Sequence, residues 1–170
     1  MGDKFENDNE MFPLVDEKGD IIGAASRAEC HDGSKKLHPV VHLHIFNSKG
    51  ELLLQKRPEW KKIQPNKWDT AVGGHIDLGE SAAQALKRET LEEEGITNYK
   101  PIFITSYIFE SKQEKEFVYV FKTIYDGEIN PSKDELTMAR FWSKKEIKDN
   151  IGKNLFTPNF ENEFKEIKIF

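Results

Sequence analysis

Three glutamates lie close together in the sequence with a spacing that suits metal chemistry. Glu89, Glu92 and Glu93 stand at positions i, i+3 and i+4, so a helix would place their carboxylates on one face. Such a face is often only a solvated acidic surface. Mg²⁺, however, takes oxygen ligands from a few carboxylates and from substrate phosphates, so the trio is also typical of a magnesium site. The glutamates alone leave both interpretations open.

The residues around this trio carry the signals of one helix and the loop before it. Small or apolar residues recur at helical spacing, namely Ala82, Ala85, Leu86 and Leu91. Ser81 and Gln84 form a capping-box pattern, and Gly95 is a typical stop signal. The sequence therefore predicts a helix over residues 81–94 that follows a glycine loop at Gly73-Gly74.

The rest of the chain predicts a mixed sheet flanked by helices, in the α/β (α+β) class. Apolar segments on either side of Gly-containing turns predict two hairpins, over residues 12–24 and 39–57. Further strands are expected at residues 101–110, 116–125 and 138–142. Ser143 and Pro158 are typical of helix starts, which predicts helices from residue 144 and from residue 158 towards 167.

The composition is that of one folded domain. The 170 residues include 12 Phe and 3 Trp, enough large apolar side chains to form a core. Residues 1–10 are polar, so we expect a flexible N-terminus before a single domain over residues 11–170. Small enzymes are commonly symmetric dimers, so a homodimer stays open.

The charge and the cysteine content limit the partners and the compartment. With 30 acidic and 25 basic side chains the formal charge is -5, so we expect no broad cationic surface and no nucleic acid polymer as partner. The single cysteine, Cys30, excludes an internal disulfide and favours a reducing compartment, the cytoplasm. The sequence begins without a leader-like pattern and has no apolar segment of membrane-spanning length, so we expect neither secretion nor membrane insertion.

A longer pattern surrounds the three glutamates. It reads Gly74, five residues, Glu80, seven residues, Arg88-Glu89, two residues, Glu92-Glu93, one residue, and Gly95-Ile96. This segment resembles the signature box of the Nudix hydrolases, and all the fixed Gly, Glu and Arg positions of that box match. The one departure is Thr90, where the family usually has a bulky aliphatic residue that packs against the sheet. The departure therefore concerns local packing more than chemistry.

The resemblance implies a fold, a cofactor and a reaction. The fold would be a Nudix-type α/β/α sandwich with a mixed sheet and a loop-helix-loop box, and the cofactor Mg²⁺ or Mn²⁺. The substrate would be a small-molecule diphosphate, attacked at phosphorus by a water whose pKa the metal lowers. The implied metal ligands are Glu89, Glu92, Glu93 and the Gly74 carbonyl, supported by Glu80 and Arg88. A glutamate would take the proton, and the candidates are Glu93 and, outside the box, Glu135.

Much of the chain, from about Leu14 to Trp142, is also similar to the branch that contains type I isopentenyl-diphosphate isomerase. The residues that carry this likeness are His31, Leu37-His38, Leu52–Arg57, Trp68, Gly74-His75, Leu78–Glu80 and Glu114–Glu116. The likeness implies a second metal site, with a transition metal such as Mn²⁺ or Zn²⁺ held by His31, His38, His75, Glu114 and Glu116. We interpret His42 and His44 as strand residues with hydrogen-bond partners.

One residue that the isomerases need is missing from this sequence. Isomerases need a cysteine immediately before the Gly-His pair, and this sequence has Gly73 there. Cys30 precedes His31 in another segment, so we interpret it as a buried or incidental thiol. The complete carboxylate set favours hydrolysis over two alternatives, an isopentenyl-diphosphate isomerase and a catalytically silent nucleotide-binding domain. The group attached to the diphosphate stays open.

Four residues near the glycine loop are candidates for substrate contacts. Lys56 and Arg57 end a predicted strand, and Lys67 precedes Trp68. The three cations suit phosphate oxygens, although solvated cations are an equally good explanation. Trp68 is a candidate for stacking on the substrate, although aromatic residues beside strands more often fill the core.

Overall fold

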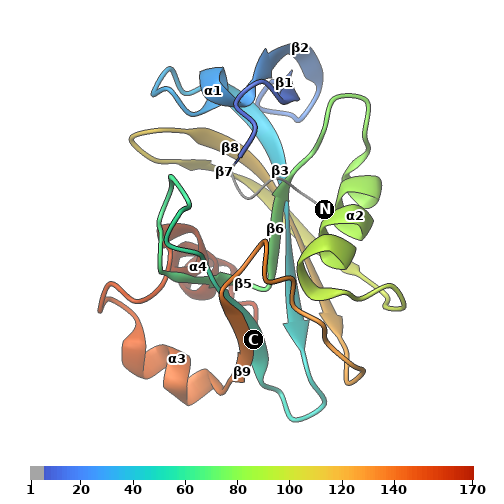
Figure 1. Ribbon diagram of the computed structural model, residues 1–170, viewed down its shortest axis with the longest axis vertical. Coiled ribbons are helices and arrows are strands. Elements are labelled where there is room, and N and C mark those ends of the chain that lie inside the picture. The colour runs from blue at the N-terminus through green and yellow to red at the C-terminus, as the bar shows by residue number, and fades with distance from the viewer. Residues whose placement is uncertain (1–5) are drawn as a thin grey trace.

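A mixed β-sheet forms the centre of the fold (Figure 1). The structure, a computed structural model, describes residues 6–170 of the chain. The strands of the sheet are β3 (Leu37–Phe46), β4 (Leu52–Lys56), β5 (Trp68–Thr70), β6 (Val72–His75), β7 (Ile102–Glu110), β8 (Lys115–Ile124) and β9 (Met138–Trp142). Their order is β5-β4-β3-β8-β7, with β6 paired to β3 and β9 paired to β4. Strands β3 and β8 run parallel, and the other pairs are antiparallel.

Helices cover both faces of this sheet, because successive residues of its strands are buried on opposite sides. Leu53 packs in one core cluster with Ala85 and Leu86 of helix α2 (Ala82–Glu94). Leu52 and Leu54 pack in a second cluster with residues of α3 (Lys144–Asn150) and α4 (Pro158–Asn162). Figure 1 shows α2 on one side of the sheet and α3 and α4 on the other. The predicted α/β/α sandwich is confirmed.

The first predicted hairpin is present as a separate small sheet. Strands β1 (Met11–Val15) and β2 (Ile21–Ser26) pair antiparallel. The sequence analysis missed α1 (Arg27–Cys30), a short helix that Ser26 caps directly after β2. Cys30 is fully buried in the cluster beneath this hairpin, as expected for a structural thiol.

The second predicted hairpin, over residues 39–57, is confirmed next to its turn only. Strands β3 and β4 pair antiparallel, but only Phe46 and Leu52 are paired in register, and β3 begins three residues before the expected strand at residues 40–46. The same edge of β3 is occupied by β6 over residues 40–43. A hairpin predicted from a local turn therefore gives way to a contact between segments that lie far apart in the sequence.

Helix α2 follows its local signals closely. Ser81 and Gln84 form the capping box, and Gly95 ends the helix in the left-handed conformation with φ 67°. Leu91, however, is 51% exposed, and Thr90 lies on the buried face instead. The Thr90 hydroxyl donates to the Leu86 carbonyl at 2.6 Å and accepts from the Tyr99 hydroxyl at 3.0 Å. This pair satisfies a polar residue at the position where an aliphatic one was expected.

The last predicted helix changes its winding near the end of the chain. Helix α4 stops at Asn162, and a π-helix, η1 (Glu163–Ile167), continues it. The switch occurs at Glu163, whose fully buried carboxylate is bonded to His42 and His44 of β3. π-Helical turns are frequent at functional sites.

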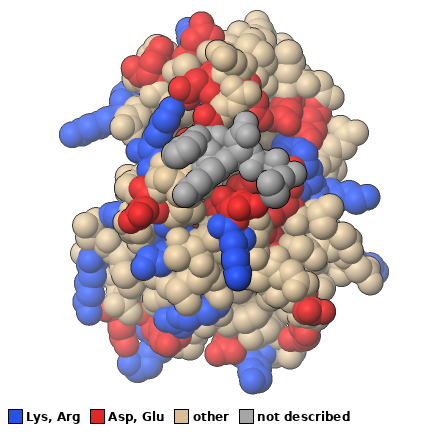
Figure 2. Space-filling view, in the orientation of Figure 1, with Lys and Arg blue, Asp and Glu red and all other residues tan. Residues whose placement is uncertain are grey.

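Charged side chains of both signs cover the surface, and the described part of the N-terminal stretch contacts the rest of the domain. No helix within residues 6–170 is long and apolar enough to cross a membrane. Figure 2 shows Lys and Arg side chains interspersed with Asp and Glu on the face in view, without a broad cationic field. Within the stretch 1–10 that we expected to be flexible, residues 1–5 lie outside the described residues. Glu6 contacts Lys61 and Arg27, and Glu10 also pairs with Arg27.

Candidate functional site

A cavity of about 410 Å³ brings together residues from both predicted metal sites. One part of its wall is formed by Gly74, Glu89, Glu92, Glu93 and Glu135, and another by His31, His75, Glu114 and Glu116. Among the described residues, the lining contains ten acidic side chains but only four Lys and Arg side chains. A diphosphate is itself an anion, so this cavity needs additional positive charge to receive one.

Gly73 and Gly74, which the sequence predicted as a loop, lie in strand β6, and helix α2 after it presents its glutamates to the cavity. A Cβ atom placed on Gly74 would lie 2.2 Å from the Glu89 carboxyl carbon, so any larger residue here would have to displace the Glu89 side chain. Burial, together with the charges of Glu92 and Glu135, raises the pKa of Glu89 to about 7 against the opposing charge and hydrogen bond of Arg88. Burial also raises the pKa of Glu92. Carboxylates that resist ionisation together fit the binding of a divalent cation.

Glu93 lies deepest of the trio and is held on both oxygens. Its Oε1 accepts from the Gln55 side chain at 3.3 Å, and its Oε2 accepts from the Gly73 backbone N–H at 3.1 Å. Burial and the nearby Glu89 raise the pKa of Glu93 well above its ordinary value. Gln55 was not named as a site residue in the sequence analysis. Its signal was a polar side chain inside an otherwise apolar strand.

Arg88, which the resemblance implied to be a supporting residue, contacts Glu80 and two glutamates of the trio. The guanidinium binds Glu80 in a bidentate manner, with both N···O distances 2.8 Å, and donates to Glu89 at 2.7 Å. It also donates to the His75 carbonyl at 3.1 Å. Arg88 thus ties the loop before α2 to the helix. Asp77 joins this group at 3.5 Å from Arg88, and burial raises its pKa to about 6.

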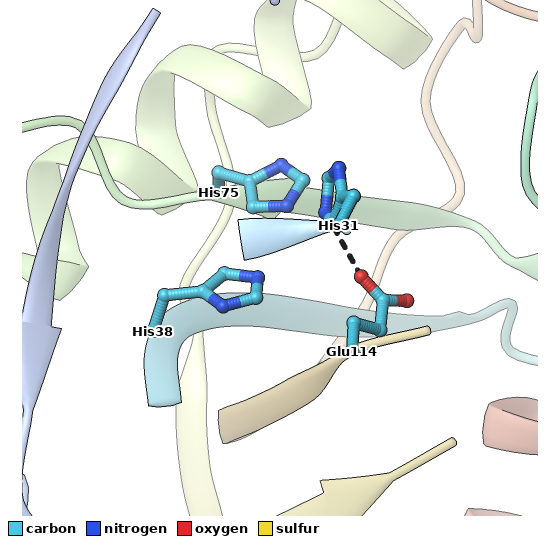
Figure 3. Close-up of side chains that lie close together, drawn as sticks. All are labelled: His31, His38, His75 and Glu114. Atoms are coloured by element: carbon cyan, nitrogen blue, oxygen red, sulfur yellow. Dashed lines mark ion pairs between the residues drawn. The ribbon is translucent and has the colours of Figure 1, made fainter. Parts of the chain in front are cut away.

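Four residues of the implied second site meet in space. Figure 3 shows His31, His38, His75 and Glu114 around one common space, and a ligand atom from each lies within 4.8 Å of the others. They come from the end of α1, from β3, from β6 and from the turn before β8. The register explains the meeting, because His75 lies opposite Val40 of β3, while Glu116, two residues after Glu114, lies opposite His38.

The donor atoms of this cluster fit a metal ion. The Nε2 atoms of all three histidines are buried and make no hydrogen bond to the part of the chain that the structure describes. His38 donates from Nδ1 to the Lys36 carbonyl at 2.8 Å, which leaves its Nε2 as a lone-pair donor. Burial lowers the pKa of His38 and that of His75, which favours the neutral form of the ring that binds metal. His31 Nε2 lies 2.9 Å from Glu114 Oε2 but without the geometry of a hydrogen bond.

Glu116, the fifth implied ligand, lies outside this group of four. It lines the same cavity and accepts from the Asn159 side chain at 3.1 Å. Burial, followed by the charge of Glu114, raises the pKa of Glu116 to about 8. The group of four that could hold a metal ion therefore has three imidazoles and one carboxylate, a donor set that suits Zn²⁺ or Mn²⁺.

The four candidate substrate contacts are mostly away from the cavity. Arg57 lines it, but the guanidinium is already bonded to the Ile63 carbonyl at 3.1 Å and to Asp69 at 3.4 Å. Lys56 and Lys67 are absent from the described lining, and Lys67 bonds to Asn154 instead. Trp68 is buried in the core against Trp142. The more common explanation of an aromatic residue beside a strand applies to it.

Two other cations that the sequence analysis did not select also line the cavity. Arg27 and Lys61 come from α1 and from the loop after β4, and both pair with Glu6. Their only sequence signal was charge, which solvated residues share. Both stand in segments whose approach to the cavity depends on the tertiary fold.

Gly74→Ala provides a sharp test of the carboxylate group. The new Cβ would displace the Glu89 side chain, so we expect activity to fall by about 100-fold, the cost of misplacing a reacting group by about 1 Å. The melting temperature should fall only slightly, since a flexible side chain can move. The matched control is Gly23→Ala in β2, outside the described lining, whose Cβ would lie 3.9 Å from the nearest atom, Leu14 Cδ1, an ordinary contact. Equal activity of the two variants in a diphosphate-hydrolysis assay would contradict the assigned position of Glu89.

Comparisons with known proteins agree with these observations. A family model described as the NUDIX domain matches residues 36–160. An uncharacterized Nudix hydrolase of Listeria monocytogenes is 32% identical over 155 residues, which cover 89% of this chain and 90% of that protein. Isopentenyl-diphosphate Delta-isomerase 1 of Photorhabdus laumondii is 28% identical over 166 residues, 93% of this chain and 94% of that protein. A crystal structure of a Deinococcus radiodurans protein aligns with a TM-score of 0.75 at 22% identity, covering 87% of this chain and 92% of that one.

Proposed function

The chain belongs to the Nudix hydrolase family, and we propose that it cleaves the diphosphate linkage of a nucleoside diphosphate derivative or a related small molecule. The cofactor of this reaction would be Mg²⁺ or Mn²⁺. The observation that carries this proposal is the complete set of Glu89, Glu92 and Glu93 on one wall of the cavity. The excess of acidic lining supports a need for divalent cations, since Arg57 and Arg88 are already paired with carboxylates.

The residues of the site would divide the work of hydrolysis. A divalent cation held by the α2 glutamates would lower the pKa of the attacking water and neutralise phosphate oxygens. Glu93 is held by Gln55 and Gly73 in a fixed orientation, which suits it to take the proton of that water. Water adds to one phosphorus, and the bond from that phosphorus to the bridging oxygen breaks. Arg88 keeps Glu89 in place by its 2.7 Å hydrogen bond.

Glu135 is the second candidate for the proton acceptor. It lies in the segment between β8 and β9 and lines the same cavity. Its charge contributes to the raised pKa values of Glu89 and Glu92, which supports a position close to both. Glu93 has the stronger case, because two hydrogen bonds fix its carboxylate.

Isomerisation of isopentenyl diphosphate is the second candidate function. It is favoured by the cluster of His31, His38, His75 and Glu114 and by the similarity to the Photorhabdus laumondii isomerase. Gly73 stands against it, because an isomerase requires a cysteine at that position to move a proton on carbon. A silent nucleotide-binding domain is disfavoured by the complete carboxylate set.

A panel assay with product identification separates these functions. The purified protein is incubated with Mg²⁺ or Mn²⁺ and with nucleoside triphosphates, dinucleoside polyphosphates, nucleotide sugars, coenzyme derivatives and isopentenyl diphosphate. Mass spectrometry follows each product. We expect metal-dependent cleavage at a diphosphate. Conversion to dimethylallyl diphosphate without phosphate release would instead support the isomerase, and ligand-dependent thermal stabilisation without turnover would support the binding domain.

A further inference from the structure

A buried polar network lies beneath the cavity and is not used by the hydrolytic scheme. The Glu163 carboxylate at the start of η1 is fully buried and accepts three hydrogen bonds. Its Oε2 lies 2.5 Å from His42 Nδ1 and 2.7 Å from the Tyr107 hydroxyl. Its Oε1 lies 2.8 Å from His44 Nε2. Strands β3 and β7 and the π-helix thus converge on one carboxylate.

Of these three donors, only His42 lines the described part of the cavity. Its Nδ1 is occupied by Glu163, while its Nε2 makes no hydrogen bond to any residue between 6 and 170. A Cβ placed on Gly73 would lie 3.5 Å from the Cδ2 atom and 3.8 Å from the Nε2 atom of His42. The absence of a side chain at Gly73 therefore leaves the Nε2 edge of the ring uncovered on this side, next to strand β6.

The network also determines the charge of this ring. Burial alone would lower the pKa of His42, but the charge and hydrogen bond of Glu163 raise it to about 9. Burial raises the pKa of Glu163, but the nearby His42 and His44 lower it by more, so it stays ionised. With Nδ1–H donated to Glu163, the remaining Nε2–H of the imidazolium has no partner within the described protein.

The three arginines that line the cavity already form ion pairs with carboxylates. Arg27 pairs with Glu6 and Glu10, Arg57 pairs with Asp69, and Arg88 pairs with Glu80. A buried network of this kind is a poor source of stability, because desolvation costs much of what the ion pair contributes. A role in fixing the orientation of the ring explains its position under the cavity better.

We propose that His42 is a substrate-contacting residue that donates its Nε2–H to a phosphate oxygen of the diphosphate, and that Glu163 is the positioning residue that holds the ring. This inference rests on the proposed function, because it concerns the same cavity. It adds a contact from β3 to those of the α2 glutamates, which line the same cavity. No covalent step at His42 is involved.

Imidazole NMR of the unmodified protein tests the contact without relying on turnover. The protein is labelled with ¹⁵N-histidine and titrated with methylenediphosphonate, a diphosphate that cannot be hydrolysed at its bridge, in the presence of Mg²⁺. We expect a saturable shift of the His42 Nε2–H signal and slower exchange of that proton with water. Binding of the probe with an unchanged His42 signal would overturn the proposal, and so would an absence of binding at millimolar probe.

Two variants test the positioning role. His42→Gln should weaken the probe about 10- to 100-fold, the value of one charge-assisted hydrogen bond. Glu163→Gln should move the His42 Nδ1–H signal and raise KM more than it lowers kcat. The control is Lys122→Gln, which removes an exposed cation paired in register with His44 and outside the described lining. Melting temperatures check that each variant folds. Equal probe affinity of folded His42→Gln and Lys122→Gln would contradict the contact.

The outcomes for His42 and for the proposed function are separable. If the protein turns over a diphosphate but its His42 signal does not change when the probe binds, the His42 contact is rejected and the proposed hydrolase function is kept. A probe-dependent His42 signal in a protein without turnover on the whole panel would keep the contact and reject the hydrolase.

Discussion

Glu93→Gln is expected to lower kcat for diphosphate hydrolysis by about 10²–10⁴-fold, the usual contribution of a general base. The amide keeps the size of the side chain and can keep the contact to Gln55, but it cannot take a proton or balance the charge of a divalent cation. The carboxylate accepts from Gln55 and from the Gly73 N–H, so the substitution changes chemistry at a fixed place. Single-turnover and steady-state kinetics at saturating Mg²⁺ measure the effect.

Glu94→Gln is the matched control for this variant. Glu94 is the next residue of α2 and is fully buried, but it is absent from the described lining of the cavity, and neither of its side-chain oxygens has a hydrogen-bond partner in residues 6–170. Burial raises the pKa of Glu94 to about 8, so it is mostly protonated at neutral pH and resembles the amide already. We expect nearly unchanged kcat in Glu94→Gln. Wild-type activity of a folded Glu93→Gln would remove Glu93 from the mechanism.

The second large effect concerns the histidine cluster. His75→Ala should weaken binding of Zn²⁺ or Mn²⁺ by at least about 100-fold, because it removes a ligand rather than a residue that merely supports one. His75 is one of four donors within 4.8 Å of one another, and its buried Nε2 has no other partner among the described residues. Elemental analysis after exposure to equal metal concentrations gives the stoichiometry, and Co²⁺ absorption reports the coordination. The melting temperature of the wild type should rise with metal, and that of the variant should not.

His44→Gln serves as the control for metal content. His44 is also a buried β3 histidine, but its Nε2 bonds to Glu163 and it takes no part in the cluster. Its metal stoichiometry should match that of the wild type. If His75→Ala also retains the full amount of metal, the four residues are not a transition-metal site, and their unpartnered nitrogens need another explanation.

Local signals accounted for the helix that carries the carboxylates. A capping box at Ser81, a glycine stop at Gly95 and glutamates one turn apart are all interactions between near neighbours, which is why the sequence predicted them without knowledge of the fold. Leu91, one of the four apolar or small residues that marked the helix, is exposed, whereas Thr90 is buried at the position that was expected to pack against the sheet. Periodicity identifies the helix well, but the sheet decides which side of it is covered.

Strand pairings between segments far apart in the sequence were harder to predict from the sequence. The turn between β3 and β4 predicted a hairpin, yet β6 takes most of that edge of β3, and β8 takes the other edge in parallel. The prediction that His31, His38, His75 and Glu114 lie together came from the family resemblance. Their spacing did not predict it, because they come from four separate segments of the chain. Trp68 and Lys67 looked suitable for substrate by type, and only the packing showed that they lie elsewhere.

The sequence by itself therefore determined the relative positions of the α2 carboxylates, because these follow from the helix that holds them. The tertiary structure alone decided that Glu163 lies beneath His42, because the two are 121 residues apart and meet only when η1 packs on the sheet. Side chains joined by local geometry can be read from residue types and spacing. Side chains joined by packing depend on the free energy of the whole core, which no single segment contains.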